Sequence, residues 1–269
     1  MNIFTTCKKF TSIKAILNLL TVNNLSVSTE YQSGSTNILD NINFNLERGK
    51  SLGVVGESGC GKSMMAIAIM GLLPDNMTVS GEVLFGSNLL SLPEKELCQI
   101  RGNKISMVFQ EPMSALNPVL PIGFQVAESL RLHKNLSHHL AQQQASKVLD
   151  RVGLPSQQYS HSLYPHQLSG GQRQRVVIAI AMACSPELII ADEPTTALDV
   201  TIQAQILALI AELVFEENMS LILITHDLGV VAENTDEMLV MYAGRIVERG
   251  PTKNVFGKHI VIIIIIIII

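Results

Sequence analysis

Short apolar runs alternate with longer stretches of helical periodicity along most of the chain. Three runs rich in Val, Ile and Leu are each followed by a helical pattern: 51–55 by 64–72, 188–191 by 202–214, and 221–225 by 228–232. Strands that are apolar along their whole length are buried on both faces, which is typical of a mainly parallel sheet covered by helices. The pattern therefore predicts an α/β fold.

Two stretches depart from this alternation. Residues 25–46 and 81–85 have the pattern of short antiparallel strands with Gly-containing turns, which predicts a small β-layer beside the main sheet. Residues 111–167 are rich in Gln, His and Leu, contain few strand-like runs and show a helical pattern at 140–152. We expect this second stretch to be a helical subdomain inserted into the α/β core.

The two ends of the chain differ from the rest. The first residues carry Lys8, Lys9 and Lys14 without an acidic residue, but no small-residue cleavage site follows, so we expect residues 1–18 to be an N-terminal extension. Residues 262–269 are eight consecutive isoleucines. A run of identical β-branched residues is an aggregation hazard. We interpret 259–269 as an aberrant tail in place of the true C-terminus, rather than as a membrane-touching anchor.

Composition narrows the class of protein. The chain has 269 residues, 47% of them hydrophobic, and a net charge of −4. It is long enough to bury a sizeable core, and none of its apolar runs reaches the roughly 18 residues that span a bilayer. A chain with a net negative charge has no overall positive potential to attract the phosphates of nucleic acid, so no nucleic-acid partner is expected. Cys7, Cys60, Cys98 and Cys184 are widely spaced, which fits a reducing cytoplasm without disulfides or zinc.

A phosphate loop follows the first apolar run. Its sequence, GESGCGKS, matches the pattern GxxxxGK[ST] and lies between a predicted strand and a predicted helix. We expect the backbone N–H groups to face phosphates, Lys62 to meet the β/γ oxygens and Ser63 to coordinate Mg²⁺. The predicted phosphate-binding residues are Gly56, Glu57, Ser58, Gly59, Cys60, Gly61, Lys62 and Ser63. A Gly-rich turn with an incidental lysine explains this strand–loop–helix context less well.

Two carboxylates follow the apolar run at 188–191. They are Asp192 and Glu193, at the carboxyl edge of the predicted sheet, where ligands of open α/β sheets bind. We expect Asp192 to hold Mg²⁺ and Glu193 to act as the general base on the attacking water. Carboxylates that merely end a strand in solvent are common, but a phosphate loop in the same chain favours the metal and base roles.

A second phosphate-binding helix start lies between these motifs, in the sequence LSGGQ at 168–172. Ser169 is a predicted N-cap, and Gly170 and Gly171 leave N–H groups open to an anion. A single bound nucleotide does not readily need two phosphate-binding helix N-termini from one chain of this size. The second start is therefore predicted to serve a nucleotide that another subunit holds.

Together, LSGGQ, GESGCGKS and LIIADEP resemble the motifs of the ATP-binding subunit of an ABC transporter. Gln110 in MVFQEP resembles the Q-loop of this family, the ALD sequence at 197–199 its D-loop, and His226 in ITHD its switch histidine. The sequences of these motifs, together with MYAGRIVERGPT near the C-terminus, are most similar to those of the dipeptide, oligopeptide and nickel importer subfamily. The resemblance covers residues 19–258.

The resemblance implies a P-loop NTPase fold: a RecA-like core with a small antiparallel β-subdomain and a helical subdomain, in one ABC ATP-binding domain at 19–258. It implies that two identical or homologous subunits close head to tail. ATP and Mg²⁺ then lie between one phosphate loop and Ser169, Gly170, Gly171 and Gln172 of the other subunit. The further partners are membrane permease subunits and, indirectly, a solute-binding protein, and the chain is peripheral on the cytoplasmic face of the inner membrane.

The resemblance also assigns roles to single residues. It implies that Glu193, His226 and Gln110 are catalytic, with His226 on the γ-phosphate and Gln110 sensing Mg²⁺ and the water. Metal ligands would be Ser63, Gln110 and Asp192, and Asp199 would belong to the nucleotide-binding set. Tyr31 is the nearest candidate for stacking on adenine, and the alternative for this residue is an exposed loop tyrosine.

Three points stay open. A soluble ABC ATPase outside transport is one alternative, although neither a second cassette nor a long coiled-coil insertion is present, and an inactive truncated fragment is another. The cargo, whether peptide, nickel or another solute, is not determined. Nickel importers raise a metal interpretation for five histidines, but their spacing defines no ligand geometry and solvated helical positions explain them better. These are His133, His138, His139, His161 and His166.

Overall fold

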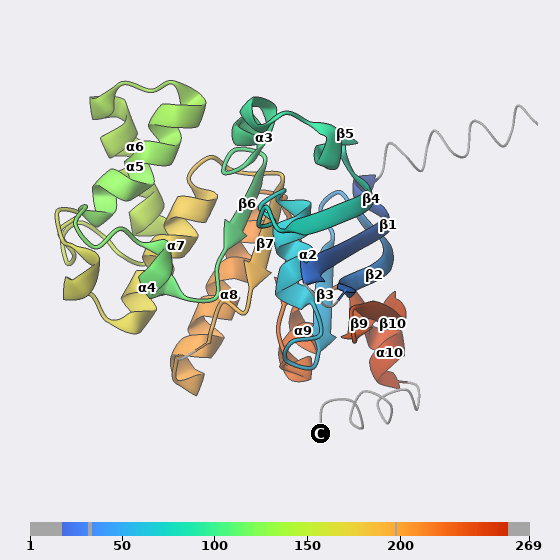
Figure 1. Cartoon of the computed structure of the whole chain (residues 1–269). Coiled ribbons are helices and arrows are strands. Elements are labelled where there is room, and N and C mark those ends of the chain that lie inside the picture. The colour runs from blue at the N-terminus through green and yellow to red at the C-terminus, as the bar shows by residue number, and fades with distance from the viewer. Residues whose placement is uncertain (1–17, 32–33, 197, 258–269) are drawn as a thin grey trace, which may run out of the picture. The chain divides into compact units, whose positions relative to one another are not determined.

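The computed structural model describes residues 18–31, 34–196 and 198–257 (Figure 1). Residues 1–17 of the expected N-terminal extension and the isoleucine tail at 259–269 lie outside the described residues. The chain forms two compact units. The first contains the residues up to Leu92 and those from Thr235 onward, and the second contains Pro93–Asn234.

An antiparallel sheet forms one layer of the first unit, in the order β2-β1-β4-β5. Its strands are β1 (Asn18–Tyr31), β2 (Gly34–Glu47), β4 (Met77–Phe85) and β5 (Ser87–Asn88), followed by a 3₁₀ turn at Leu89–Ser91. On β1, Val22 lies opposite Phe44 of β2 and Val83 of β4. All three side chains are buried, so cross-strand apolar pairs hold this layer together.

A second group of strands in the first unit carries the phosphate-loop sequence. Strand β3 (Ser51–Gly56) pairs in parallel with β9 (Glu237–Tyr242), which pairs antiparallel with β10 (Arg245–Pro251). Among the described residues of this unit, the α-helices are α2 (Lys62–Ile69) and α10 (Thr252–Gly257). Leu52, Val54 and Val55 of β3 are fully buried, as the apolar run predicts. The Asp236 carboxylate accepts 3.0 Å hydrogen bonds from the backbone N–H and the hydroxyl of Ser51, which fixes where β3 begins.

The second unit contains three parallel strands in the order β6-β7-β8. They are β6 (Ile105–Val108), β7 (Leu188–Asp192) and β8 (Ser220–Ile224), and every residue in them is buried. The helices are α3 (Glu94–Ile100), α4 (Pro112–Ala115), α5 (Ile122–Lys134), α6 (His138–Arg151), α7 (Gly170–Met182), α8 (Val200–Glu216) and α9 (Leu228–Asn234), with a 3₁₀ turn at Pro165–Gln167. Between residues 111 and 167 all regular structure is helical.

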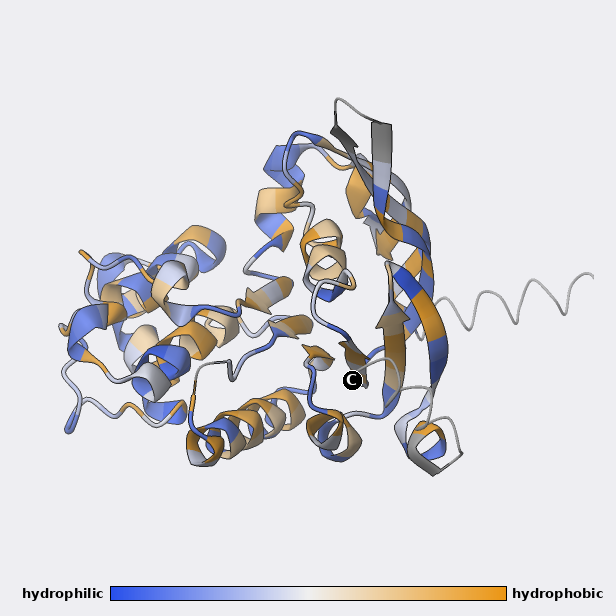
Figure 2. Cartoon of the chain, turned by 60° about the horizontal axis from the view of Figure 1, so that its bottom comes forward, coloured by the Kyte–Doolittle hydropathy of each residue, from blue (hydrophilic) through white to orange (hydrophobic). Residues whose placement is uncertain are grey.

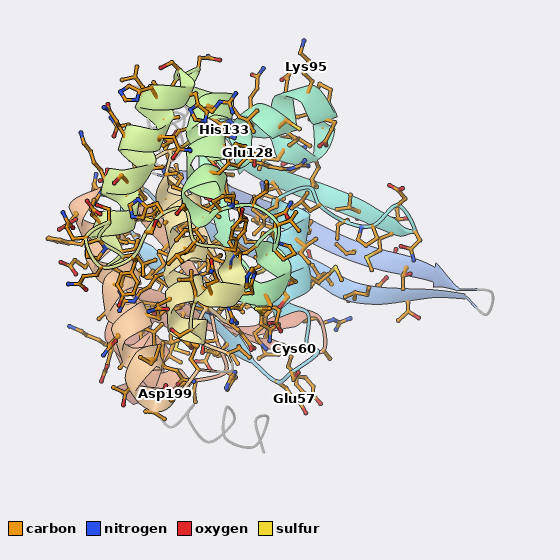
Figure 3. The ribbon with its side chains drawn as sticks, turned by 90° about the vertical axis from the view of Figure 1, so that its left-hand side faces the viewer. Glu57, Cys60, Lys95, Glu128, His133 and Asp199 are labelled. Carbon is orange, nitrogen blue, oxygen red and sulfur yellow. The ribbon has the colours of Figure 1, made fainter. Side chains whose placement is uncertain are left out.

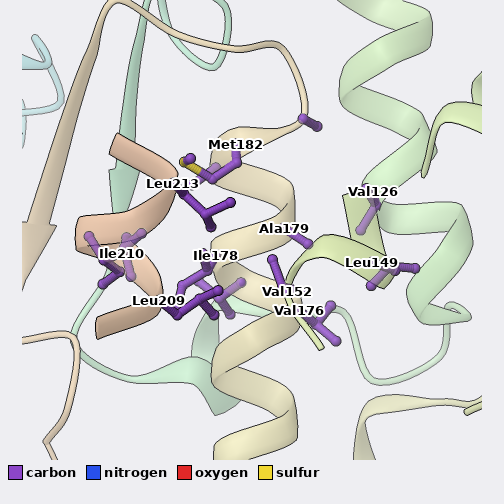
Figure 4. Close-up of a cluster of buried hydrophobic side chains, with 14 of the residues drawn as sticks. Val126, Leu149, Val152, Val176, Ile178, Ala179, Met182, Leu209, Ile210 and Leu213 are labelled. Atoms are coloured by element: carbon purple, nitrogen blue, oxygen red, sulfur yellow. The ribbon is translucent and has the colours of Figure 1, made fainter. Parts of the chain in front are cut away.

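Helix α7 lies at the centre of the second unit's apolar core. In Figure 4, its side chains face α8 on one side and α5 and α6 on the other, with Val126 and Leu149 on the latter side. The helices show hydrophobic and hydrophilic residues side by side, as expected for helices that pack one apolar face on a core (Figure 2). None of the helices in the described part of the chain combines the length and apolar character needed to cross a membrane.

Removing a side chain from this core should destabilise the second unit. Leu149 is fully buried in α6, so Leu149→Ala should lower the free energy of unfolding by about 2 to 5 kcal/mol, through lost burial and the cavity that remains. The control is Leu132→Ala in α5, where the side chain is 70% exposed and the change should stay within about 0.5 kcal/mol. Urea unfolding followed by circular dichroism measures both, and equal losses would contradict the assigned core.

Candidate nucleotide-binding and catalytic site

The phosphate loop connects β3 to α2 in the first unit. Gly56 has φ +155°, and a Cβ at this position would lie 2.2 Å from the carbonyl oxygen of Met241. Only glycine fits there without moving the backbone of β9. The loop is tied down further along, since the N–H of Gly244 donates to the carbonyl of Cys60 at 3.0 Å and the N–H of Cys60 donates to Glu57 at 3.2 Å. The β9–β10 turn therefore helps to set the loop's shape.

The side chain of Lys62 is buried within the phosphate loop and binds its backbone. This side chain is 5% exposed, and its ammonium donates 2.9 Å hydrogen bonds to the carbonyl oxygens of Gly56 and Glu57. The Cys60 thiol is also buried, 3.9 Å from the ammonium, and burial raises its pKa. Figure 3 labels Glu57 and Cys60 in this loop. A buried cation with two backbone acceptors is preorganised beside the segment that we predict to hold phosphates.

In the second unit, Asp192 and Glu193 stand at the end of β7 in different environments. Asp192 is 4% exposed and continues the ladder opposite Ile224, so it is not a strand end in solvent. Glu193 adopts a left-handed backbone with φ +43°. Its N–H donates to the carbonyl of Ile224 at 2.9 Å. This sharp turn ends the strand directly after a buried carboxylate.

Three loops meet at the Glu193 carboxylate, all within the second unit. Gln110, after β6, donates from Nε2 to Glu193 Oε2 at 3.0 Å. His226, after β8, places Nδ1 3.6 Å from Glu193 Oε1. Thr196 places its hydroxyl 3.1 Å from Oε2. The structure thus brings together the three residues that the sequence suggests as catalytic, and it adds Thr196, which the sequence analysis missed.

The LSGGQ motif forms the start of α7. Ser169 Oγ accepts from the N–H of Gln172 at 3.3 Å, and Gln172 Oε1 accepts from the N–H of Ser169 at 2.8 Å, which is a reciprocal capping box. A Cβ at Gly171 would lie 2.8 Å from Cγ2 of Ile202 in α8. The glycine is therefore needed for the close approach of these two helix starts.

Several other predicted residues have defined positions. Asp199 caps α8, with Oδ1 accepting from the N–H of Ile202 at 3.0 Å. Ala197 of the D-loop and the side chain of Tyr31, the last residue of β1, lie outside the described residues. Ser63 is half-buried in the first turn of α2.

The five histidines do not converge. His161 lies 3.0 Å from the carbonyl of Leu154, His139 lies 3.1 Å from Gln143, and His166 stacks on Tyr164 with ring centroids 5.8 Å apart. Partial burial lowers the pKa of His133. Within the described ranges, no group of three or more His, Cys, Asp or Glu side chains could hold a metal ion.

Comparison with known proteins identifies the family. The ABC transporter family matches residues 39–196. The oligopeptide transport ATP-binding protein OppD of Salmonella typhimurium is 50% identical over 243 residues, which cover 90% of this chain and 72% of OppD. The dipeptide transport ATP-binding protein DppD of Bacillus subtilis is 48% identical over 241 residues, covering 88% of this chain and 72% of DppD.

Solved structures agree with this result. The ATP-binding cassette MJ0796, in a dimeric post-hydrolysis state bound to ADP and Pi, matches with a TM-score of 0.77 at 29% identity, over 87% of this chain and 98% of that one. The chain therefore belongs to the ABC transporter family. The predictions of a P-loop NTPase fold and of an ABC ATPase are confirmed.

The Lys62 contacts lead to a test of the phosphate loop. Lys62→Ala removes a fixed cation from the loop, so MgATP should bind about 10- to 100-fold more weakly, the usual cost of a lost hydrogen bond to a charged group. Lys50→Ala is the matched control, because this exposed lysine pairs with Asp236 at the beginning of β3. Titration with a fluorescent ATP analogue measures both affinities, and equal affinities would contradict the role of Lys62.

Proposed function

We propose that this chain is the subunit that hydrolyses ATP to energise a peptide importer, as a peripheral protein on the cytoplasmic face of the inner membrane. The carrying observation is the Glu193 carboxylate, which is held by Gln110 and faced by His226 at the end of a buried strand. The names of OppD and DppD support peptides as the cargo, and they favour a transport ATPase over one that acts elsewhere.

The predicted phosphate- and metal-binding residues would bind MgATP. Lys62 and the backbone of residues 56–63 would bind the phosphates, as the loop geometry supports. Hydroxyl, amide and carboxylate oxygens are suitable Mg²⁺ ligands, and Ser63, Gln110 and the buried Asp192 offer one of each. Bound Mg²⁺ would neutralise charge on the β- and γ-phosphate oxygens. Gln110 donates through Nε2, so its Oε1 is the side of the amide suited to the metal or the water.

Glu193 would act as the general base on the attacking water. Its Oε2 already accepts from Gln110 Nε2, which orients the carboxylate. Its Oε1 lies 3.6 Å from His226, longer than a hydrogen bond, and is the oxygen that we assign to the water. The His226 side chain is 70% exposed and so is accessible to a γ-phosphate. General-base catalysis of this kind contributes about 10²- to 10⁴-fold in rate.

We propose that the complete site needs a second subunit, identical or homologous. The start of α7, with Ser169, Gly170, Gly171 and Gln172, would contact the γ-phosphate held by the partner, and Asp199 would lie at the same interface. The solved structures of MJ0796 are dimeric, which supports a second subunit. Permease subunits in the membrane would complete the importer, and a solute-binding protein would act through them.

Glu193→Gln tests the base role. The amide keeps the shape of the side chain but loses its basicity, so ATP should still bind while turnover falls by about 10²- to 10⁴-fold. The variant should accumulate as an ATP-dependent dimer in size-exclusion chromatography. In membrane vesicles that contain the permease partners, it should also stop uptake of a labelled oligopeptide. Turnover at the wild-type rate would refute the base role, and an inactive wild-type protein would indicate a defective fragment.

Ser169→Arg tests the shared site. An arginine at the start of α7 should leave ATP binding to the isolated subunit intact and block turnover, because it obstructs the surface that meets the partner. Mixing this variant with Lys62→Ala subunits gives one doubly defective site and one normal site in each mixed dimer. Partial recovery of ATPase activity is expected if one normal site suffices. Loss of ATP affinity in the isolated Ser169→Arg subunit would show that the motif serves its own nucleotide.

A further inference from the structure

The contacts of Thr196 form a compact turn around Glu193. The Thr196 N–H donates to the carbonyl oxygen of Glu193 at 3.2 Å, and the Thr196 hydroxyl lies 3.1 Å from that oxygen and 3.1 Å from Glu193 Oε2. Both oxygens can only accept, so the hydroxyl is the donor. The carbonyl already accepts from the Thr196 N–H. A carboxylate is a stronger hydrogen-bond acceptor than a carbonyl, so we assign the single hydroxyl proton to Oε2.

The backbone of Glu193 is fixed at the same time. Its N–H donates to Ile224 of β8, and its carbonyl accepts from Thr196, so a left-handed conformation that is costly for a non-glycine residue is held on both sides. These backbone hydrogen bonds fix the position of the Cα atom from which the Glu193 side chain extends. What remains to be set is the rotation of the carboxylate about its own bonds.

The two carboxylate oxygens have different surroundings. Oε2 lies within hydrogen-bond distance of two donors, Gln110 Nε2 at 3.0 Å and the Thr196 hydroxyl at 3.1 Å. Oε1 is the oxygen that faces His226. Gln110 belongs to the loop after β6, whereas Thr196 lies in the same turn as Glu193. The contact of Thr196 with Oε2 therefore needs only the turn that contains Glu193, whereas the contact of Gln110 also depends on the loop after β6.

We propose that Thr196 is a positioning residue for ATP hydrolysis, whose hydroxyl ties down Glu193 Oε2 so that Oε1 is directed at the attacking water. This inference rests on the base role proposed for Glu193. Thr196 contacts the base and is not itself assigned a contact with the nucleotide. Its effect should therefore fall on turnover and not on ATP binding.

The test compares Thr196→Val with Thr196→Ser in steady-state ATPase assays. Valine keeps the branched shape without the hydroxyl, so kcat should fall about 10- to 100-fold while KM for ATP stays within about twofold. Serine keeps the hydroxyl and should restore most of the wild-type kcat. Thr78→Val, at an exposed threonine of β4, is the matched control and should leave kcat unchanged. Thr196→Ala replaces the valine variant if valine prevents folding, as judged by thermal unfolding.

The outcomes separate this inference from the proposed function. If wild-type protein turns over ATP and Glu193→Gln does not, a Thr196→Val kcat within twofold of wild type overturns the positioning role. Equal losses in the serine and valine variants also overturn it, because the hydroxyl would then not matter. Adding Thr196→Val to Glu193→Gln should cause no further loss of the residual rate. If Glu193→Gln turns over ATP as fast as wild type, the base role itself fails.

Discussion

Parallel strands that are buried on both faces force the chain to leave the core at their carboxyl ends, and the chemistry of this protein depends on that constraint. In the first unit the phosphate loop begins where β3 ends. In the second unit Gln110, Glu193 and His226 each follow the end of a strand whose residues are all buried. Because β6, β7 and β8 are parallel neighbours, their ends lie along one edge, and the polar residues meet there without any being adjacent in sequence.

At both places the backbone must adopt conformations that ordinary residues avoid. In the phosphate loop, glycine at position 56 is required by the carbonyl of Met241, and Lys62 stabilises the curled backbone from inside. At position 193 the proposed base role requires a carboxylate, so glycine could not replace Glu193 to relieve the left-handed turn. Such a conformation costs of order 1–3 kcal/mol. Backbone hydrogen bonds with Ile224 and Thr196 offset that cost and fix the backbone that carries the carboxylate.

The LSGGQ sequence meets two demands with the same residues. Its serine and glutamine close a capping box at the start of α7, which stabilises the helix without any ligand. Its second glycine admits Ile202 of α8, so the start of α7 packs tightly against the helix that Asp199 caps. The motif thus forms a close packing contact between two helices of the second unit, and it is also the surface proposed to contact a partner's nucleotide.

The sequence alone determined the fold class and most of the candidate site, since those features depend on local pattern. The apolar runs predicted β3, β7 and β8, the LSGGQ serine predicted the cap of α7, and the strand end at 192–193 predicted Glu193 as a base. Gln110 and His226 were suggested by the resemblance of their motifs to those of the ABC family. Only the tertiary structure revealed what these residues contact. The hydrogen bond from Thr196 to Glu193, the approach of Met241 to Gly56 and that of Ile202 to Gly171 arise from a turn geometry and from segments distant in the chain. No periodicity or spacing encodes such distances, because they depend on how the packed elements come together.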